Sequence, residues 1–111
     1  MDIIFASRKL RNQCNDHRLT VKTWGMVQAK KLGQRLDDLK AAATLEVMRS
    51  LPGRCHEMKG NRAGQLSLDL EHPYRLVFKP ANHPISLKED GGLDWGRVTS
   101  VLILGVEDTH G

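Results

Sequence analysis

Two short segments that alternate polar and apolar residues constrain the fold of this 111-residue chain more strongly than any other feature. The alternation runs without a fault over residues 65–71 and resumes over residues 74–79, after His72 and Pro73. A period of two is typical of a strand that buries one face. Because the connection between the segments is so short, we expect the two strands to be antiparallel neighbours.

The first half of the chain has a different period. The apolar residues of segment 20–43 fall near helical spacing, so we expect one amphipathic helix there. Two glycines inside it, Gly25 and Gly33, each cost about 1 kcal/mol relative to alanine, so this helix must depend on packing. The other elements expected in this half are a strand over residues 3–5, a short helix or loop over residues 7–18, and a helical turn through Arg49 capped by Thr44.

A further strand is expected after a long loop. Residues 99–106 are almost continuously apolar, which is typical of a central strand with both faces covered. The loop over residues 80–97 contains two prolines and two adjacent glycines, and we expect one helical turn near Asp94 and Trp95. Helices followed by strands predict an α+β fold: a single domain over residues 1–111, with helices on one face of a small antiparallel sheet.

The balance of charge changes along the chain. The whole sequence carries 17 Lys and Arg against 13 Asp and Glu, a net charge of +4. Residues 1–62 contain thirteen basic and six acidic side chains, whereas residues 63–111 contain four and seven. A basic half favours an anionic partner, with nucleic acid as the leading candidate; a merely soluble basic surface is the alternative.

Several classes of protein and site are excluded by what the sequence lacks. The longest apolar run falls far short of the roughly twenty residues that a membrane span needs, and the N-terminus has no signal-peptide pattern. The two cysteines and five histidines show neither a disulfide framework nor the paired spacing of zinc ligands. We therefore expect a cytoplasmic protein with no membrane contact, no metal and no cofactor.

The densest group of cations lies between the two halves, in the segment His56-Glu57-Met58-Lys59-Gly60-Asn61-Arg62. A turn that holds His, Lys and Arg so close together can bind a phosphate and oppose the charge that develops on it in a transition state. The alternative is a solvated basic turn.

Two further candidates lie beyond this turn. Arg75 lies on the strand face opposite Tyr74 and its alternating neighbours, so it faces the open side of the sheet if those residues pack on the helices. A buried salt bridge is the competing role for Arg75. The tetrapeptide Glu107-Asp108-Thr109-His110 follows the apolar strand, and His110 can accept and release a proton near neutral pH. A solvated chain end is the alternative there.

These motifs resemble a known family. The string H-E-M-K-G-N-R-A-G over residues 56–64 is similar to the H-x-L-K-G-D-R-x-G signature of HigB-type toxins, the plasmid maintenance killer proteins of the RelE/ParE superfamily. That family continues with W/Y-R-I-x-F, matched here by residues 74–78, and closes with E-D-Y-H, matched by residues 107–110. The resemblance is specific over roughly the second half of the chain.

The resemblance implies two helices against a small antiparallel sheet and a role in a bacterial type II toxin–antitoxin system. The implied activity is ribosome-dependent, metal-independent cleavage of mRNA, which inhibits translation and arrests growth. Such cleavage uses the RNA 2′-hydroxyl as nucleophile, which explains why RNA rather than DNA is cut. The implied partners are the ribosome, mRNA and a cognate helix-turn-helix antitoxin of the HigA type.

The resemblance also implies catalytic residues. The reaction needs a base for the 2′-hydroxyl, cations for the phosphate and an acid for the leaving 5′-oxygen. By position, His56 and His110 are the candidates for proton transfer, and Lys59 and Arg75 are the candidates for phosphate charge.

The implied RNA-binding residues are Arg62, Asp108 and Thr109. Arg62 shapes the loop or touches the RNA backbone, and Asp108 orients His110 or a backbone group. Thr109 departs from the family because it stands where tyrosine is usual, so a ring that stacks on a base or acts as an acid is missing. The remaining departures are Asn61 in place of Asp, which keeps a turn former, and Glu71 where relatives can carry a basic residue.

Two other functions stay open. A ParE-type inhibitor of DNA gyrase shares the implied fold and needs no acid–base set. A non-catalytic interaction protein, either a decayed toxin or a regulator of a toxin operon, is consistent with Thr109. The sequence shows no helix-turn-helix pattern, which counts against the regulator.

Overall fold

A five-stranded sheet forms the centre of the computed structural model, in which residues 1–108 are described. The expected antiparallel hairpin is confirmed, and its second strand pairs antiparallel with the last strand. The first strand pairs in parallel with the last, so the sheet is mixed and the expectation of a wholly antiparallel sheet is wrong at that edge. In order across the sheet, the strands are β1 (Asp2–Phe5), β5 (Ser100–Asp108), β4 (Tyr74–Pro80), β3 (Leu66–Asp69) and β2 (His56–Glu57).

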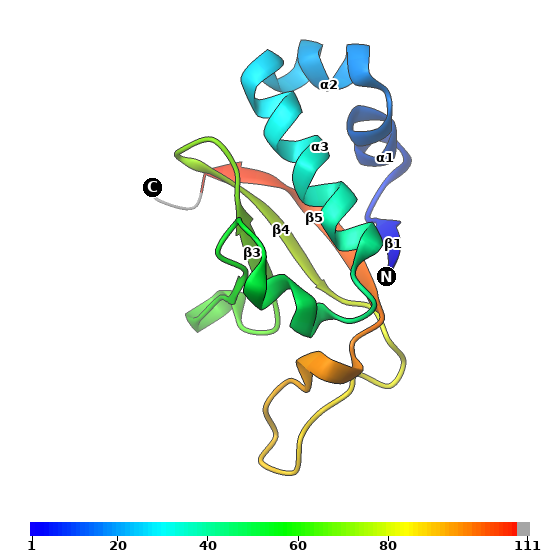
Figure 1. The fold of residues 1–111 in the computed structure, drawn as a ribbon, viewed down its shortest axis with the longest axis vertical. Helices are drawn as coiled ribbons and strands as arrows, with labels where there is room; N and C mark the ends of the chain where they lie inside the picture. Colours follow the sequence, from blue (N-terminus) through cyan, green and yellow to red (C-terminus); the bar gives the residue numbers. More distant parts are fainter. Residues whose placement is uncertain (109–111) are drawn as a thin grey trace.

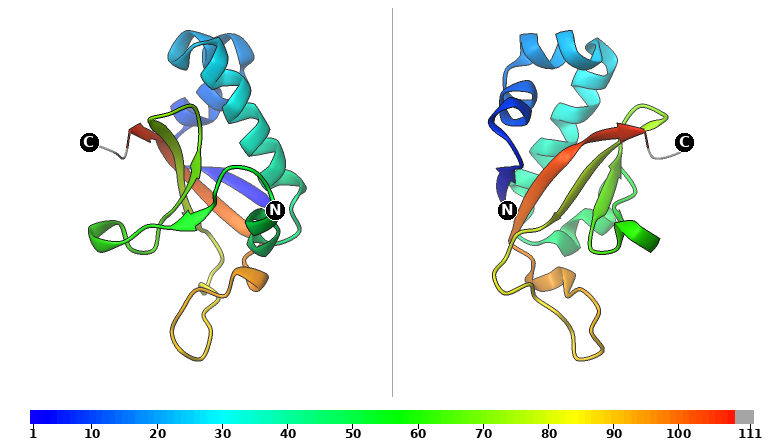
Figure 2. Two further views of the ribbon diagram at one scale, coloured as in Figure 1. Left: turned by 60° about the vertical axis from the view of Figure 1, so that its left-hand side comes forward. Right: turned by 180° about the vertical axis from the view of Figure 1, so that it is seen from behind.

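The α-helices all lie on one face of the sheet, and within residues 1–108 the other face carries no α-helix (Figures 1 and 2). The segment expected as one helix over residues 20–43 is divided at Gly25, whose φ of +87° ends one helix and begins the next. The α+β prediction is confirmed, with the single long helix replaced by two. The helices are α1 (Arg8–Asn15), α2 (His17–Trp24) and α3 (Met26–Ala41).

The core lies between α3 and the sheet. Leu32 and Leu39 of α3 have no exposed surface, and neither do Leu76 and Phe78 of β4. Removing a side chain of this kind from water stabilises the fold by about 1.5–3 kcal/mol. The apolar residues at helical spacing on α3 and the alternating apolar residues on β4 therefore pack against each other in one buried layer.

Strand β5 contains a bulge that changes which residues face the helices. Phe78 pairs with Ile103 but Val77 pairs with Gly105, so Leu104 is an extra residue in the ladder. Ile103 is fully buried before the bulge, and Val106 packs against the core after it, whereas Leu104 is half-buried. The expectation that both faces of residues 99–106 are covered is wrong, because Leu102 and Leu104, which alternate with the buried Val101 and Ile103, are only half-buried.

The long loop before β5 is anchored by a buried tryptophan. The expected turn near Trp95 is confirmed as the 3₁₀ helix η3 (Trp95–Arg97). The Trp95 ring donates a hydrogen bond from Nε1 to Glu57 Oε2 at 3.1 Å, and the Arg49 guanidinium lies 3.7 Å from the ring centroid. The helical turn expected before it is the 3₁₀ helix η1 (Leu45–Ser50); the Thr44 side chain makes no capping hydrogen bond among the described residues, so that expected cap is wrong.

Candidate functional site

The face of the sheet opposite the α-helices carries an open depression of about 400 Å³ beside β2 and the 3₁₀ helix η2 (Gly60–Arg62). Four of the residues predicted for the site line it together: His56, Lys59, Arg62 and Arg75. They meet because strand pairing folds the chain back: β2 pairs with β3, and β3 pairs with β4. The cationic turn and the strand arginine therefore belong to one surface.

Strand register places a row of charged residues across this face. Asp69 on β3, Arg75 on β4 and Glu107 on β5 are direct cross-strand partners, so their side chains share one face of the sheet. Leu76 and Phe78 are buried on the opposite face. The prediction that Arg75 lies on the face away from the helices is confirmed.

Arg75 is also held by an ion pair. Its Nε lies 3.2 Å from Asp69 Oδ1, and only 15% of its side chain is exposed. Arg54 donates a hydrogen bond from Nε to the second carboxylate oxygen of Asp69 at 3.0 Å, which raises the pKa of the Arg54 guanidinium. Asp69 was not predicted, although the sequence contained the signal: Asp69 and Arg75 are equidistant from His72 at the centre of the hairpin.

Arg62 makes a two-pronged ion pair with Glu107. Its Nη1 and Nη2 donate to Oε1 and Oε2 of Glu107 at 3.1 and 2.8 Å, and its Nε donates to Gln65 Oε1 at 2.8 Å. The hydrogen bonds to Glu107 raise the pKa of Arg62. This fork geometry ties the turn after β2 to the end of β5. Of the two roles expected for Arg62, these contacts favour shaping the loop.

His56 has a defined orientation. Its Nδ1 lies 2.9 Å from the carbonyl oxygen of Arg54, whose backbone takes a left-handed φ of +49°. Because a carbonyl oxygen only accepts, Nδ1 carries the proton in the neutral ring and Nε2 keeps a free lone pair. A ring held in this tautomer can take up a proton at Nε2. Lys59, three residues further on, is exposed to solvent.

The C-terminal motif is described only in part. Asp108 is exposed at the end of β5, where it is the register partner of Tyr74. Thr109 and His110 lie outside the described residues, so their expected roles stay predictions. Glu107, in the same motif, had no predicted role and is the partner of Arg62.

Two polar residues of α3 hold the hairpin that carries the site. The Gln28 side-chain amide pairs with the backbone of Glu71: Nε2 donates to the carbonyl at 3.2 Å, and Oε1 accepts from the N–H at 2.8 Å. Arg35 Nε donates to the Asp69 carbonyl at 2.9 Å. Both side chains are buried. Neither role was predicted from the sequence, because a polar residue on a helix is usually exposed to solvent.

Cys55, the residue before His56, is not a reactive nucleophile. Burial raises the pKa of the Cys55 thiol to about 12, so it stays protonated at neutral pH and is a poor nucleophile. Within residues 1–108, no three His, Cys, Asp or Glu side chains are grouped closely enough to hold a metal ion. None of the helices described here is long and apolar enough to cross a membrane.

Comparison with known proteins identifies the fold. No protein-family model and no curated protein matches the sequence. The YoeB/ParE toxin from Agrobacterium tumefaciens is similar over 99% of this chain and 100% of its own, with a TM-score of 0.60 and 11% identity. The YoeB-YefM complex from Staphylococcus aureus gives 0.55 at 16% identity, and the YoeB dimer from the same organism gives 0.53 at 18%; each covers 96% of this chain and 94% of the other. The chain therefore has the same fold as these YoeB/ParE-type toxin structures.

Proposed function

We propose that this chain is the toxin of a bacterial type II toxin–antitoxin system and that it is a metal-independent endoribonuclease acting on mRNA at the ribosome. One observation carries the proposal: His56, Lys59, Arg62 and Arg75 line a single depression, on a fold shared with YoeB/ParE-type toxins. A proton acceptor and several cations in one place match the needs of phosphodiester cleavage.

The proposed reaction is an internal transfer at phosphorus. His56 Nε2 takes the proton of the RNA 2′-hydroxyl as the 2′-oxygen forms a bond to the phosphorus atom. The bond from phosphorus to the 5′-oxygen breaks, which leaves a 2′,3′-cyclic phosphate. The leaving 5′-oxygen takes a proton from a general acid, for which His110 is the candidate. Arg75 and Lys59 stabilise the negative charge on the phosphate oxygens.

The ion pairs of the site support this assignment. Arg75 is fixed by Asp69, and the Asp69 backbone is fixed in turn by Arg35 of α3. A charge held in place before the substrate arrives needs no reorganisation during the reaction. Arg62, tied to Glu107, holds the turn that presents Lys59.

The proposed partners are the ribosome, mRNA and a cognate antitoxin. Structural neighbours include a heterotetrameric complex of the YoeB-YefM toxin–antitoxin from Staphylococcus aureus, which supports an antitoxin partner. The HigB-type assignment, with a helix-turn-helix antitoxin of the HigA type, is supported by the sequence matches at residues 56–64, 74–78 and 107–110. Asp108 and Thr109 remain proposed RNA contacts.

Inducible expression in a bacterial host tests the proposal. We expect growth arrest and new mRNA 5′ ends at translated codons, and we expect His56→Ala and Arg75→Ala to relieve both. Lys79→Ala, an exposed cation on the same strand, is the matched control and should stay toxic. Full toxicity of both variants would contradict the assignment of His56 and Arg75 to the catalytic site. A DNA-damage response without mRNA cleavage selects gyrase as the target, and no effect on growth or translation selects a non-catalytic protein.

A further inference from the structure

The strand β1 forms one edge of the sheet, at the opposite side from β2 and the depression. Its N–H groups at Asp2 and Ala6 donate to the carbonyls of Thr99 and Ile103, at 3.0 and 2.9 Å. Because alternate residues of a strand direct their backbone groups to the same side, the N–H and C=O groups of Ile3 and Phe5 point away from β5. An edge of this kind is a template for one more strand.

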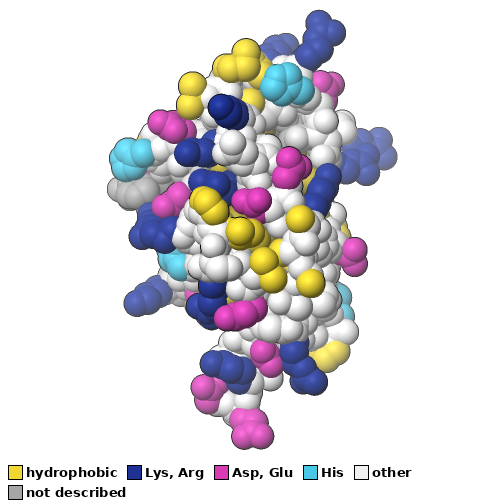
Figure 3. All heavy atoms as spheres, viewed as in Figure 1, with side chains coloured by type: hydrophobic (Ala, Val, Ile, Leu, Met, Phe, Trp, Pro, Cys, Tyr) yellow, Lys and Arg dark blue, Asp and Glu magenta, His cyan; other side chains and the backbone are white. Residues whose placement is uncertain are grey.

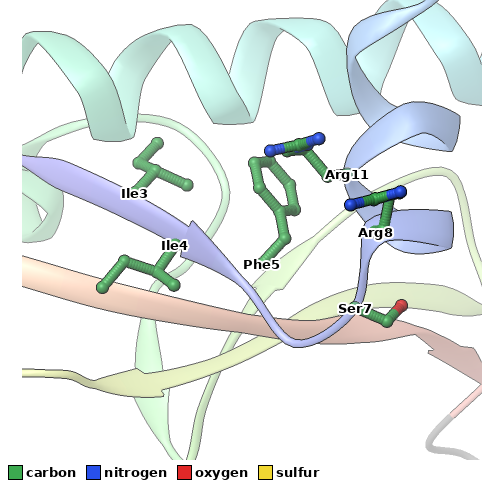
Figure 4. Close-up of a pocket in the computed structure, with 6 residues that line it drawn as sticks. All are labelled: Ile3, Ile4, Phe5, Ser7, Arg8 and Arg11. Carbon is green, nitrogen blue, oxygen red and sulfur yellow. The ribbon is translucent and has the colours of Figure 1, made fainter.

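A pocket of about 330 Å³ opens along this edge, between β1 and α1. Figure 4 shows Arg8 and Arg11 of α1 on the same side of β1 as Phe5, with Ile4 directed to the other side. Ile4 is 50% exposed on that other side, where the exposed Asp2 alternates with it, and its register partner on β5 is Leu102. The two sides of the edge therefore differ: one carries the two arginines, and the other carries the apolar side chain of Ile4 and the carboxylate of Asp2.

The positive charge beside the pocket is not neutralised by any residue within the described range 1–108. Arg8 and Arg11 are exposed, and neither forms an ion pair with another described residue. The first turn of α1 contains no acidic residue, so Arg8 adds its charge to the positive end of the helix dipole. In Figure 3, Lys and Arg side chains gather at the margin of the molecule over α1. A carboxylate bound here would be favoured by both sources of potential.

We propose that the β1 edge binds an extended segment of a partner protein as an additional strand. The segment carries carboxylates at alternate positions, which face Arg8 and Arg11, and apolar residues between them, which extend the surface of Ile4. A second copy of this chain fits poorly, because pairing two β1 edges brings their arginines together. RNA offers phosphates to the arginines but lacks the repeating donors and acceptors of a strand. The inference is independent of the proposed cleavage, since it concerns the opposite edge of the sheet.

The test uses the full chain and a labelled peptide of about ten residues, the length of a long strand, that alternates glutamate and valine. We expect saturable binding, and we expect hydrogen exchange of the Ile3 and Phe5 amides to slow roughly tenfold or more. The amides of Asp2 and Ala6, which already pair with β5, should be unchanged. A peptide methylated at alternate backbone nitrogens keeps the charges but loses the donors, so it should not bind.

Charge variants test the arginines. Arg8→Glu with Arg11→Glu should weaken peptide binding roughly tenfold or more, whereas the control Lys22→Glu with Lys30→Glu makes the same charge change elsewhere and should have little effect. Equal binding of the methylated peptide overturns the proposal, because charge alone then explains the affinity. Unchanged exchange at Ile3 and Phe5 overturns strand addition. Binding of single-stranded RNA, but not of the peptide, through Arg8 and Arg11 also overturns it.

Discussion

The arginines of the depression and those of the β1 edge differ in their partners. In the depression, Arg62 is bound by Glu107 and Arg75 by Asp69, whereas Arg8 and Arg11 form no ion pair with a described residue. A paired arginine is held in one orientation, which suits chemistry that needs a charge at a fixed point. An unpaired arginine keeps its full charge for a partner and is ordered only on binding. The net charge of a region does not distinguish these two roles of arginine, whereas the presence or absence of an ion-pair partner does.

The largest effect is expected from removing the fixed charge in the depression. Arg75→Ala should lower the rate of mRNA cleavage by about 10²–10³-fold, the usual cost of losing one stabilising group for the transition state. Single-turnover cleavage of a ribosome-bound message measures it. Lys79→Ala should cleave at the parental rate. If Arg75→Ala cleaves at that rate too, Arg75 is only a structural ion-pair partner, and the contrast with the edge arginines fails.

Substituting Gly53 should destabilise the turn that packs against Arg35, which in turn holds the Asp69 backbone beside the depression. A Cβ there would lie 2.8 Å from Arg35 Nε, and the φ of +115° is strained for any other residue. Gly53→Ala should therefore lower the free energy of unfolding by about 2 kcal/mol. Gly33→Ala on α3 is the control: nothing lies within 4 Å of its Cβ position, so stability should rise by up to about 1 kcal/mol. Urea denaturation measures both, and equal stability of the two variants contradicts the packing of Arg35 on this turn.

The reactivities of Cys14 and Cys55 allow a comparison of α1, near the β1 edge, with the surroundings of the depression. Burial raises the pKa of Cys14, on α1, to about 11 and that of Cys55, beside the depression, to about 12. Cys55 should therefore react with iodoacetamide more slowly than Cys14, and both should react more slowly than an exposed cysteine. Because the protonated thiol is the form favoured by folding, this contribution to stability is present below about pH 9 and is lost as the pH rises toward 11 and 12. Mass spectrometry resolves the two sites, and faster labelling of Cys55 would show an open site.

The smallest effect is expected when Arg62 loses its ion-pair partner and its charge becomes available to RNA, like the charges of Arg8 and Arg11. Glu107→Gln removes the charge that holds Arg62, so affinity for a non-cleavable 2′-O-methyl RNA should rise about threefold at low salt. Stability should fall by less than about 1 kcal/mol, because the pair is partly exposed. Glu46→Gln, which removes the exposed partner of Arg49, is the control. Fluorescence anisotropy decides: a gain shared by both variants reflects net charge alone.

Local patterns predicted the strands better than the helices. The β3–β4 hairpin is confirmed because alternation and a short connection are both local. Gly25 ends α2 at a φ of +87°, but one glycine within helical spacing does not reveal a break, since apolar residues on both sides contribute to one core. The parallel pairing of β1 with β5 joins segments far apart in the chain, and no local pattern reports it.

The cationic residues of the candidate site were predicted from the sequence, whereas the residues that hold them in place were not. His56, Lys59, Arg62 and Arg75 line one depression, as the motif order predicted, while their chemical roles stay predictions. The supports Gln28 and Arg35 are polar residues whose burial depends on where the hairpin packs, which α3 alone does not specify. The acidic second half of the chain, which lowered the net charge, supplies the carboxylates that fix the arginines.

The bulge at Leu104 gives β5 one position at which its length can change. Phe78 pairs with Ile103 and Val77 with Gly105, so deleting Leu104 would leave a regular ladder and keep Glu107 opposite Arg75. A deletion between Gly105 and Glu107 would move Glu107 out of register and turn it toward the helices. Insertions and deletions in this strand should therefore be tolerated at a single point, and the distance from Gly105 to the end of the strand should be the part that related sequences cannot vary.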